Sequence, residues 1–89
     1  MRLRLAIRGR VQGVWFRGSA REEALRLGLV GWARNRGDGS VEIVAEGTPS
    51  AMNSFLEWCH HGPPGAHVHD VTQNAEPSGD DLVDFRVRY

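Results

Sequence analysis

Residues 9–17 combine two glycines, an unbroken run of backbone N–H donors and an arginine, a set suited to holding an anion. Gly9 and Gly13 permit backbone conformations that most residues avoid and let main chain approach a ligand closely. No proline interrupts the segment, so every residue keeps its N–H. We call residues 9–17 the glycine loop.

A helix is expected to follow the glycine loop, and this placement adds to the case for an anion. The N–H groups at a helix start lack partners, and the helix dipole is positive there. Arg17 adds a planar, permanently charged group that can bind two oxygens at once. We therefore predict a phosphate-sized ligand held by main chain along Val11, Gln12, Gly13, Val14, Trp15, Phe16 and Arg17.

Metal binding is the competing chemistry, because four histidines lie close together in the sequence. On a strand, His67 and His69 would share one face, as a zinc site requires. However, Cys59 belongs to an apolar helical stripe, and His60 and His61 flank a Pro-Pro loop without the spacing of known metal motifs. We interpret the histidines as solvated residues and predict no metal.

The elements that must position these groups are predicted from periodicity. Leu3, Leu5 and Ile7 alternate with more polar residues and predict a strand. Helical spacing of apolar residues predicts a helix over residues 18–27, and Gly28 suits its left-handed cap. A second strand is expected over residues 29–34. Among the aromatic residues, we assign Phe16 and Trp32 to the core and make no assignment for Trp15 and Trp58.

The second half repeats the alternation of strand and helix. Asp38-Gly39 predicts a hairpin leading to a strand over residues 41–46. Thr48 suits the N-cap of the next helix and Pro49 its first position. The apolar stripe of that helix is Met52, Phe55, Leu56 and Cys59.

Two further strands complete the predicted fold. The less regular one is marked by Val68 and Val71, the short C-terminal one by Phe85, Val87 and Tyr89, and residues 76–81 between them form a polar loop. The order βαββαβ with a short C-terminal strand predicts an α+β, ferredoxin-like two-layer sandwich, an antiparallel sheet with two helices on one face. We expect residues 1–89 to form a single domain.

This topology brings Asn35 near the glycine loop. A helical crossover makes the first two strands parallel, so their ends share one edge of the sheet. If the third strand lies between them, the two ends are about 10 Å apart, two strand spacings. Side chains of Arg17 and Asn35 can then both reach one bound group.

Charge is balanced overall but distributed unevenly. Residues 1–36 hold nine arginines and two acids, a net +7, and residues 37–89 hold two arginines and nine acids, a net −7. Nucleic-acid binding by the first half is one explanation. We favour a small anion, because most of these arginines alternate with apolar residues on a strand. A single cysteine, no signal peptide and no membrane-spanning run predict a cytoplasmic protein.

Two blocks of this sequence resemble acylphosphatases. The first is Gly9-x-Val11-Gln12-Gly13-Val14-x-Phe16-Arg17, and the second is Gly31-Trp32-Ala33-Arg34-Asn35. Gly39-x-Val41 and Gly47 continue the similarity over nearly the whole chain. The resemblance implies the fold predicted above and the hydrolysis of small acyl phosphates to a carboxylate and inorganic phosphate.

By the same resemblance, Arg17 binds the phosphoryl group and Asn35 positions the attacking water. The substrate's own phosphate oxygens accept the proton of that water, and neither a cofactor nor a metal is required. Expected partners are acyl phosphates and inorganic phosphate, with no nucleic acid or membrane, and the protein is expected to be a monomer.

Two other classes of function compete with an enzyme. One is a non-catalytic binding module of this fold, such as an RNA binder, although the first and third predicted strands lack the stacking aromatics that such modules use. The other is an acylphosphatase-like domain of a larger carbamoyl-transfer protein, which would carry zinc-finger cysteines. We favour a stand-alone hydrolase.

Overall fold

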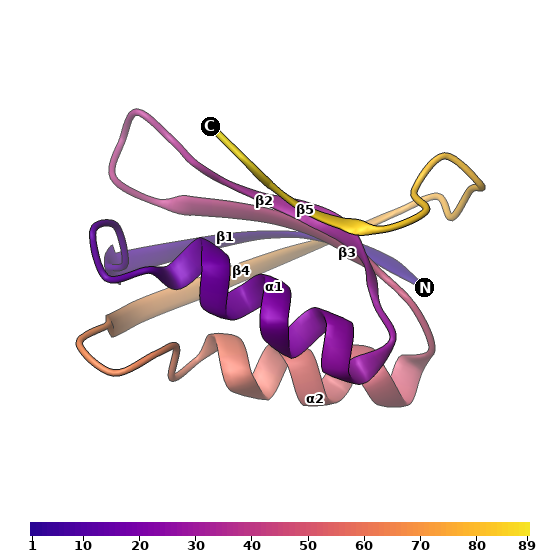
Figure 1. The fold of residues 1–89 in the computed structure, drawn as a ribbon, viewed down its shortest axis with the longest axis horizontal. Coiled ribbons are helices and arrows are strands. Elements are labelled where there is room, and N and C mark those ends of the chain that lie inside the picture. The colour runs from indigo at the N-terminus through magenta and orange to yellow at the C-terminus, as the bar shows by residue number, and fades with distance from the viewer.

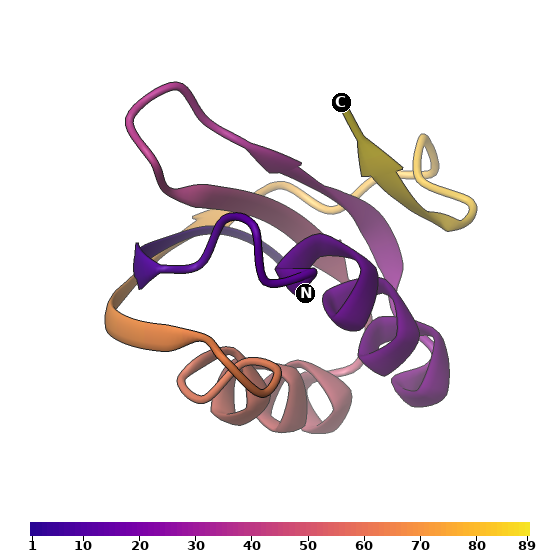
Figure 2. The same ribbon diagram turned by 60° about the vertical axis from the view of Figure 1, so that its left-hand side comes forward.

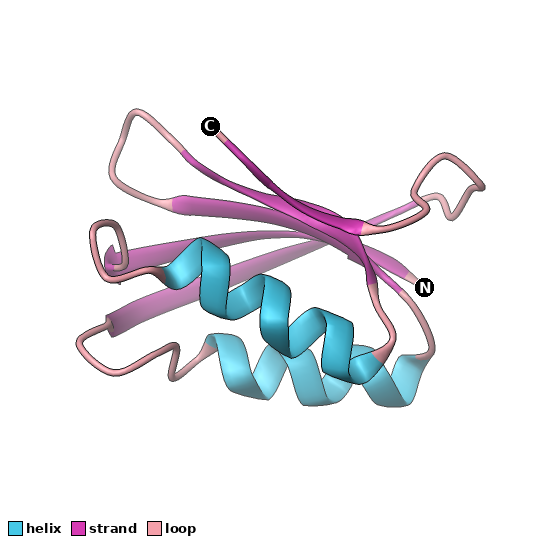
Figure 3. Cartoon of the chain, viewed as in Figure 1, coloured by secondary structure: helices cyan, strands magenta, loops and turns pink.

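Residues 1–89 are described by a computed structural model, in which two helices cover one face of a five-stranded sheet (Figures 1 and 3). The sheet order is β4-β1-β3-β2-β5. Pairing is antiparallel except where β5 joins β2 in parallel. In chain order the elements are β1 (Arg2–Arg10), α1 (Phe16–Leu27), β2 (Val30–Asn35), β3 (Val41–Glu46), α2 (Pro49–Cys59), β4 (His67–Glu76) and β5 (Phe85–Arg88).

The predicted α+β sandwich is confirmed, together with the apolar faces that form its core. Alternating residues of the strands meet the inner stripes of α1 and α2, which bury Phe16, Ala20 and Ala24 on one helix and Met52 and Phe55 on the other. Figure 2 shows both helices beneath the same face of the sheet. Neither has the length and apolar character that a membrane span needs.

The predicted turns and caps are also confirmed. Gly28 ends α1 in the left-handed conformation, with φ 75°. Thr48 caps α2, its side chain accepting a hydrogen bond from the Ala51 N–H at 3.2 Å. In the β2–β3 hairpin, Asp38 accepts hydrogen bonds from both the backbone and the hydroxyl of Ser40.

Strand β4 is longer than the sequence pattern indicated. It runs for ten residues and pairs with β1 along the whole length of that strand. Most of its side chains are exposed because it forms an edge of the sheet, and the apolar alternation that would have marked its ends is therefore weak.

Gly9 belongs to this sheet pairing rather than to a ligand site. The register between β1 and β4 shifts beside it, and its φ is 133°. A Cβ there would lie 2.1 Å from the carbonyl oxygen of His67. Only glycine allows the two strands to approach this closely.

The face of the sheet away from the helices is charged, and Trp32 lies on it. The assignment of Trp32 to the core was therefore wrong: it is half-buried, and the guanidinium groups of Arg4, Arg34 and Arg88 lie 5.7, 5.7 and 4.7 Å from its ring. The assignment of Phe16 to the core is confirmed. A lone tryptophan in a strand carries no local sign of which face it occupies, and here arginines replace apolar neighbours.

Glu42 is the centre of this charged face. It is 5% exposed and accepts hydrogen bonds from Arg4 and Arg34, each at 2.5 Å. Burial alone would raise the pKa of Glu42, but the two guanidinium groups outweigh burial and hold that pKa below its ordinary value. Arg4 also pairs with Glu76, so the network links β1 to β3, β2 and β4.

We expect Glu42→Gln to lower the free energy of unfolding by about 1–3 kcal/mol at pH 7, because charge-assisted hydrogen bonds are lost beside two arginines. A lowered folded-state pKa means that this stability is present above the ordinary carboxyl pKa and is lost as pH falls through the folded value. Urea titrations from pH 7 to pH 2 should therefore show the two proteins converging below about pH 4. Glu57→Gln, at an exposed position of α2, is the control, and a gap that persists to pH 2 would contradict the argument.

Candidate active site

The glycine loop and Asn35 lie at the same end of the sheet, where β1 and β2 both finish, as the topology predicted. Strand β3 lies between β1 and β2, and both β1 and β2 run antiparallel to β3. The loop after β1 and the end of β2 therefore share an edge, on the left in Figure 1. Arg17 and Asn35 both line a single pocket of about 880 Å³.

Main chain in the glycine loop offers a row of unpaired donors. The backbone N–H groups of residues 12–18 donate to no protein acceptor. The first hydrogen bond of the helix is donated by the Ser19 N–H to the Trp15 carbonyl at 3.0 Å. Trp15, the N-cap of α1, gives no side-chain cap, and no acidic residue stands in the first turn. These donors lie at the positive end of the helix dipole, and no side chain of the first turn neutralises it.

Two residues with positive φ shape this row. Gly13 has φ 77°, and a Cβ there would have no atom within 4 Å, so the main chain is open to a ligand. Trp15 has φ 62° and is the one non-glycine residue of the chain with positive φ. A bulky residue adopts this conformation only where its surroundings impose it, which marks the start of α1 as strained.

The loop is anchored from both ends by buried side chains. Val11 and Phe16 are 1% and 2% exposed and belong to the core. Phe16 also packs on Trp58, with ring centroids 5.3 Å apart. Val14 is half-buried against the core, and neither it nor Gln12 lines the pocket.

Gln12 ties the loop to the hairpin, a role that the sequence did not reveal. Its side-chain amide donates to the carbonyls of Arg36 at 2.8 Å and Ser40 at 3.0 Å. These acceptors are main-chain atoms more than twenty positions away, so no local pattern announces the contact. The link holds the loop and the end of β2 in one fixed relation.

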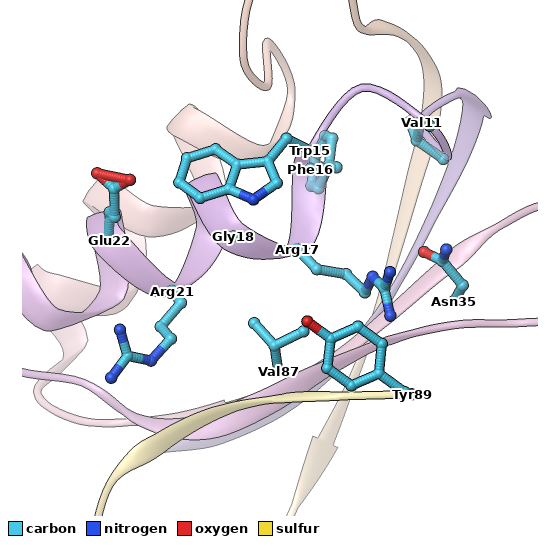
Figure 4. Close-up of a pocket in the computed structure, with 11 residues that line it drawn as sticks. Val11, Trp15, Phe16, Arg17, Gly18, Arg21, Glu22, Asn35, Val87 and Tyr89 are labelled. Atoms are coloured by element: carbon cyan, nitrogen blue, oxygen red, sulfur yellow. The ribbon is translucent and has the colours of Figure 1, made fainter.

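Arg17 is held by the C-terminal strand. Its Nη1 donates to the carbonyl of Arg88 at 2.9 Å, and its guanidinium lies 4.6 Å from the ring centre of Tyr89. No carboxylate pairs with Arg17, so its charge is uncompensated. In Figure 4 the guanidinium points toward Asn35 across the pocket.

Several pocket residues were not singled out from the sequence. They come from the outer side of α1 and from β5, whose pairing with β2 brings the C-terminus to the pocket. Their types are ordinary for a helix surface and a short strand, and only the packing of β5 beside α1 brings them together. They are Gly18, Arg21, Glu22, Val87 and Tyr89.

The histidines do not assemble into a site. His60, His61, His67 and His69 are all exposed, and the structure contains no group of three or more His, Cys, Asp or Glu side chains able to hold a metal. Cys59 is buried in the core, and burial raises the pKa of its thiol far above the ordinary range. That thiol is therefore protonated and unsuited to metal binding.

Comparisons with known proteins agree on one family. The family model described as Acylphosphatase matches residues 3–87. Curated proteins named Acylphosphatase include one from Rubrobacter xylanophilus, 49% identical over 98% of this chain and 79% of the relative. Another, from Aeropyrum pernix, is 50% identical over 100% of this chain and 89% of the relative. The crystal structure of acylphosphatase from Bacillus subtilis has a TM-score of 0.95 at 40% identity, covering 99% of this chain and 98% of that one.

We expect Gln12→Ala to loosen the loop without unfolding the sheet. Loss of two side-chain hydrogen bonds should lower the free energy of unfolding by about 1–2 kcal/mol. Hydrogen exchange of the Ser19 and Arg36 amides, which are hydrogen-bonded to the carbonyls of Trp15 and Ser40 at the two ends of this link, should become faster, because the loop is freed from the hairpin. Gln73→Ala, at an exposed position of β4, is the matched control, and equal exchange rates in the two variants would refute the anchoring role.

Proposed function

The chain belongs to the acylphosphatase family and hydrolyses acyl phosphates (EC 3.6.1.7), and from this premise we propose how its pocket performs the reaction. The main chain of the glycine loop and Arg17 bind the phosphoryl group, and Asn35 positions the attacking water. The observation that carries the proposal is the run of unpaired N–H groups at residues 12–18 beside an uncompensated guanidinium.

Phosphoryl transfer requires alignment and charge stabilisation more than covalent help from the protein. Charge on the three equatorial oxygens would be met by the loop N–H groups and by Arg17. These donors are already in place, because Gln12 and the core hold the loop and β5 holds the guanidinium. Donors that need no rearrangement are the ones that stabilise a transition state most effectively.

Asn35 is suited to orienting the water. It ends β2, across β3 from the loop, and it lines the same pocket as Arg17. Its amide oxygen can accept a hydrogen bond from a water placed in line with the departing carboxylate. Figure 4 shows Asn35 facing the Arg17 guanidinium.

The proton transfers that the reaction needs also fit an acyl phosphate substrate. Water attacks phosphorus, the bond between phosphorus and the bridging oxygen breaks, and the carboxylate leaves as a weak base that needs no acid. The water's proton passes to a phosphoryl oxygen of the substrate. Glu22 is the sole carboxylate lining the pocket, and in Figure 4 it points away from Arg17.

A nucleic-acid-binding role is less well supported than hydrolysis. Single-strand binders need aromatic rings and unpaired cations on the open sheet face. Here Arg4 and Arg34 are paired with Glu42, and Trp32 is covered by guanidinium groups. The charged face is better explained by ion pairs that hold neighbouring strands together.

We propose that residues 1–89 act as one domain, a monomer working in the cytoplasm without a metal or other cofactor. Support for metal independence is the chemistry above, in which Arg17 and the loop supply the positive charge. Support for the location is that Cys59, the single cysteine, can form no disulfide within the chain.

Replacing Arg17 tests the phosphoryl site. We expect Arg17→Ala to lower kcat/KM for benzoyl phosphate by about a thousandfold and to abolish inhibition by inorganic phosphate. Arg17→Lys should recover little, because the planar guanidinium also binds the Arg88 carbonyl. Arg86→Ala, an exposed arginine of β5, is the control. A fully active lysine variant would exclude two-point binding by Arg17.

Replacing Asn35 tests the water-positioning role. Asn35→Ala should lower kcat by about a hundredfold or more while the inhibition constant of inorganic phosphate stays the same, because the amide acts on water and not on phosphate. Steady-state kinetics with phosphate as competitor measures both quantities. Asn53→Ala, on the exposed side of α2, controls for the substitution itself. Parallel loss of turnover and phosphate affinity would contradict the assigned role.

A further inference from the structure

Two arginines one helical turn apart on α1 reach across to β5 in the same way. Arg17 donates from Nη1 to the Arg88 carbonyl at 2.9 Å, and Arg21 donates from Nε to the Phe85 carbonyl at 3.0 Å. Both arginines line the active-site pocket. Since a catalytic role requires only one of them, the second calls for a separate explanation.

The two acceptor carbonyls lie well apart along β5, so the two guanidinium groups are held at separate points. Phe85 and Arg88 are three residues apart on an extended strand, which is about 10 Å. In Figure 4, the side chains of Arg17 and Arg21 diverge toward opposite ends of the pocket. The pocket therefore has one cation at the reacting end and another at the far end.

Arg21 is free to bind a ligand. One nitrogen is used on the Phe85 carbonyl, and no carboxylate forms a salt bridge with this side chain. The acid next to it in sequence, Glu22, points to the other side of the helix in Figure 4. Arg26, also on α1, is by contrast paired with Glu23.

Two apolar side chains, Trp15 and Val87, line the same pocket as the two arginines. Trp15 lies over Gly18, where a Cβ would come within 2.2 Å of the indole, so the absence of a side chain at Gly18 is what admits the ring. Val87 lies between Phe85 and Arg88 in β5 and lines the opposite wall. An indole face and a valine suit a hydrocarbon segment better than a hydrated one.

We propose that Arg21 is a specificity residue that binds a second carboxylate at the far end of the acyl group. The preferred substrates are then acyl phosphates of dicarboxylic acids, with the phosphoryl group at Arg17 and the hydrocarbon part against Trp15 and Val87. A para-substituted aromatic acyl phosphate places its phosphorus and its distal carboxylate carbon roughly 8 Å apart, and hydrogen bonds of about 2.9 Å at each end bring both within reach of the two arginines. This inference rests on the proposed function of the pocket.

The test compares two substrates that differ at the far end. We choose 4-carboxybenzoyl phosphate and 4-methylbenzoyl phosphate, and we measure the ratio of their kcat/KM values in the wild type, Arg21→Gln, Arg21→Lys and the control Arg26→Gln. The ratio should fall about tenfold in Arg21→Gln, two- to threefold in Arg21→Lys, and not at all in the control. Differences in intrinsic reactivity between the substrates cancel in this comparison.

Ionic strength provides a second readout that a structural role of Arg21 would not affect. Added salt should lower the ratio in the wild type, because the Arg21 side chain is exposed, and should leave it unchanged in Arg21→Gln. Loosening of β5 in the variant would slow both substrates together and leave the ratio as it was. A wild-type ratio that matches that of Arg21→Gln within twofold overturns the specificity role while the hydrolase assignment stands. Failure of the wild type to hydrolyse either substrate overturns both.

Discussion

Unpaired backbone N–H groups at the start of α1 are the constraint on which the arrangement of this protein depends. A folded chain normally satisfies such groups, and leaving several of them open costs stability. Here they stay open because the loop is fixed from three directions: Val11 and Phe16 in the core, Gln12 on the hairpin, and the helix itself behind them. The pocket is thus preorganised for an anion before any ligand arrives.

The arginines likewise divide into a group paired with carboxylates and a group without such partners. Arginines of the first 36 residues meet acids of the rest of the chain across the open face of the sheet, with Arg2, Arg4 and Arg34 all joined to carboxylates. These pairs account for much of the uneven distribution along the sequence. Arg17 and Arg21 are excluded from that network by lying on α1, on the other side of the sheet. Their charge remains available to a ligand.

Most of the fold could be predicted because its signals are local: the alternation in β1 and β3, the spacing in α1 and α2, the caps at Gly28 and Thr48. Parts of the site followed from topology, which placed Asn35 near the loop. Contacts between side chains and distant main-chain carbonyls were not predictable. The acceptors of Gln12, Arg17 and Arg21 are backbone atoms far away in the sequence, and only the folded positions of the strands bring them close. Trp32 was misassigned for a related reason: β2 has apolar residues on both faces, and Arg4 and Arg88, which lie against the Trp32 ring, come from other strands.

The roles proposed for Arg17 and Arg21 both depend on strand β5. It is four residues long and pairs with β2 at the edge of the sheet, yet two of its carbonyls orient two arginines of α1. Because a carbonyl carries no charge, it fixes each guanidinium without neutralising it, whereas a carboxylate would have filled the site with a salt bridge. The strand therefore orients both arginines of the proposed anion-binding points, and a change in its pairing with β2 would shift both of them together.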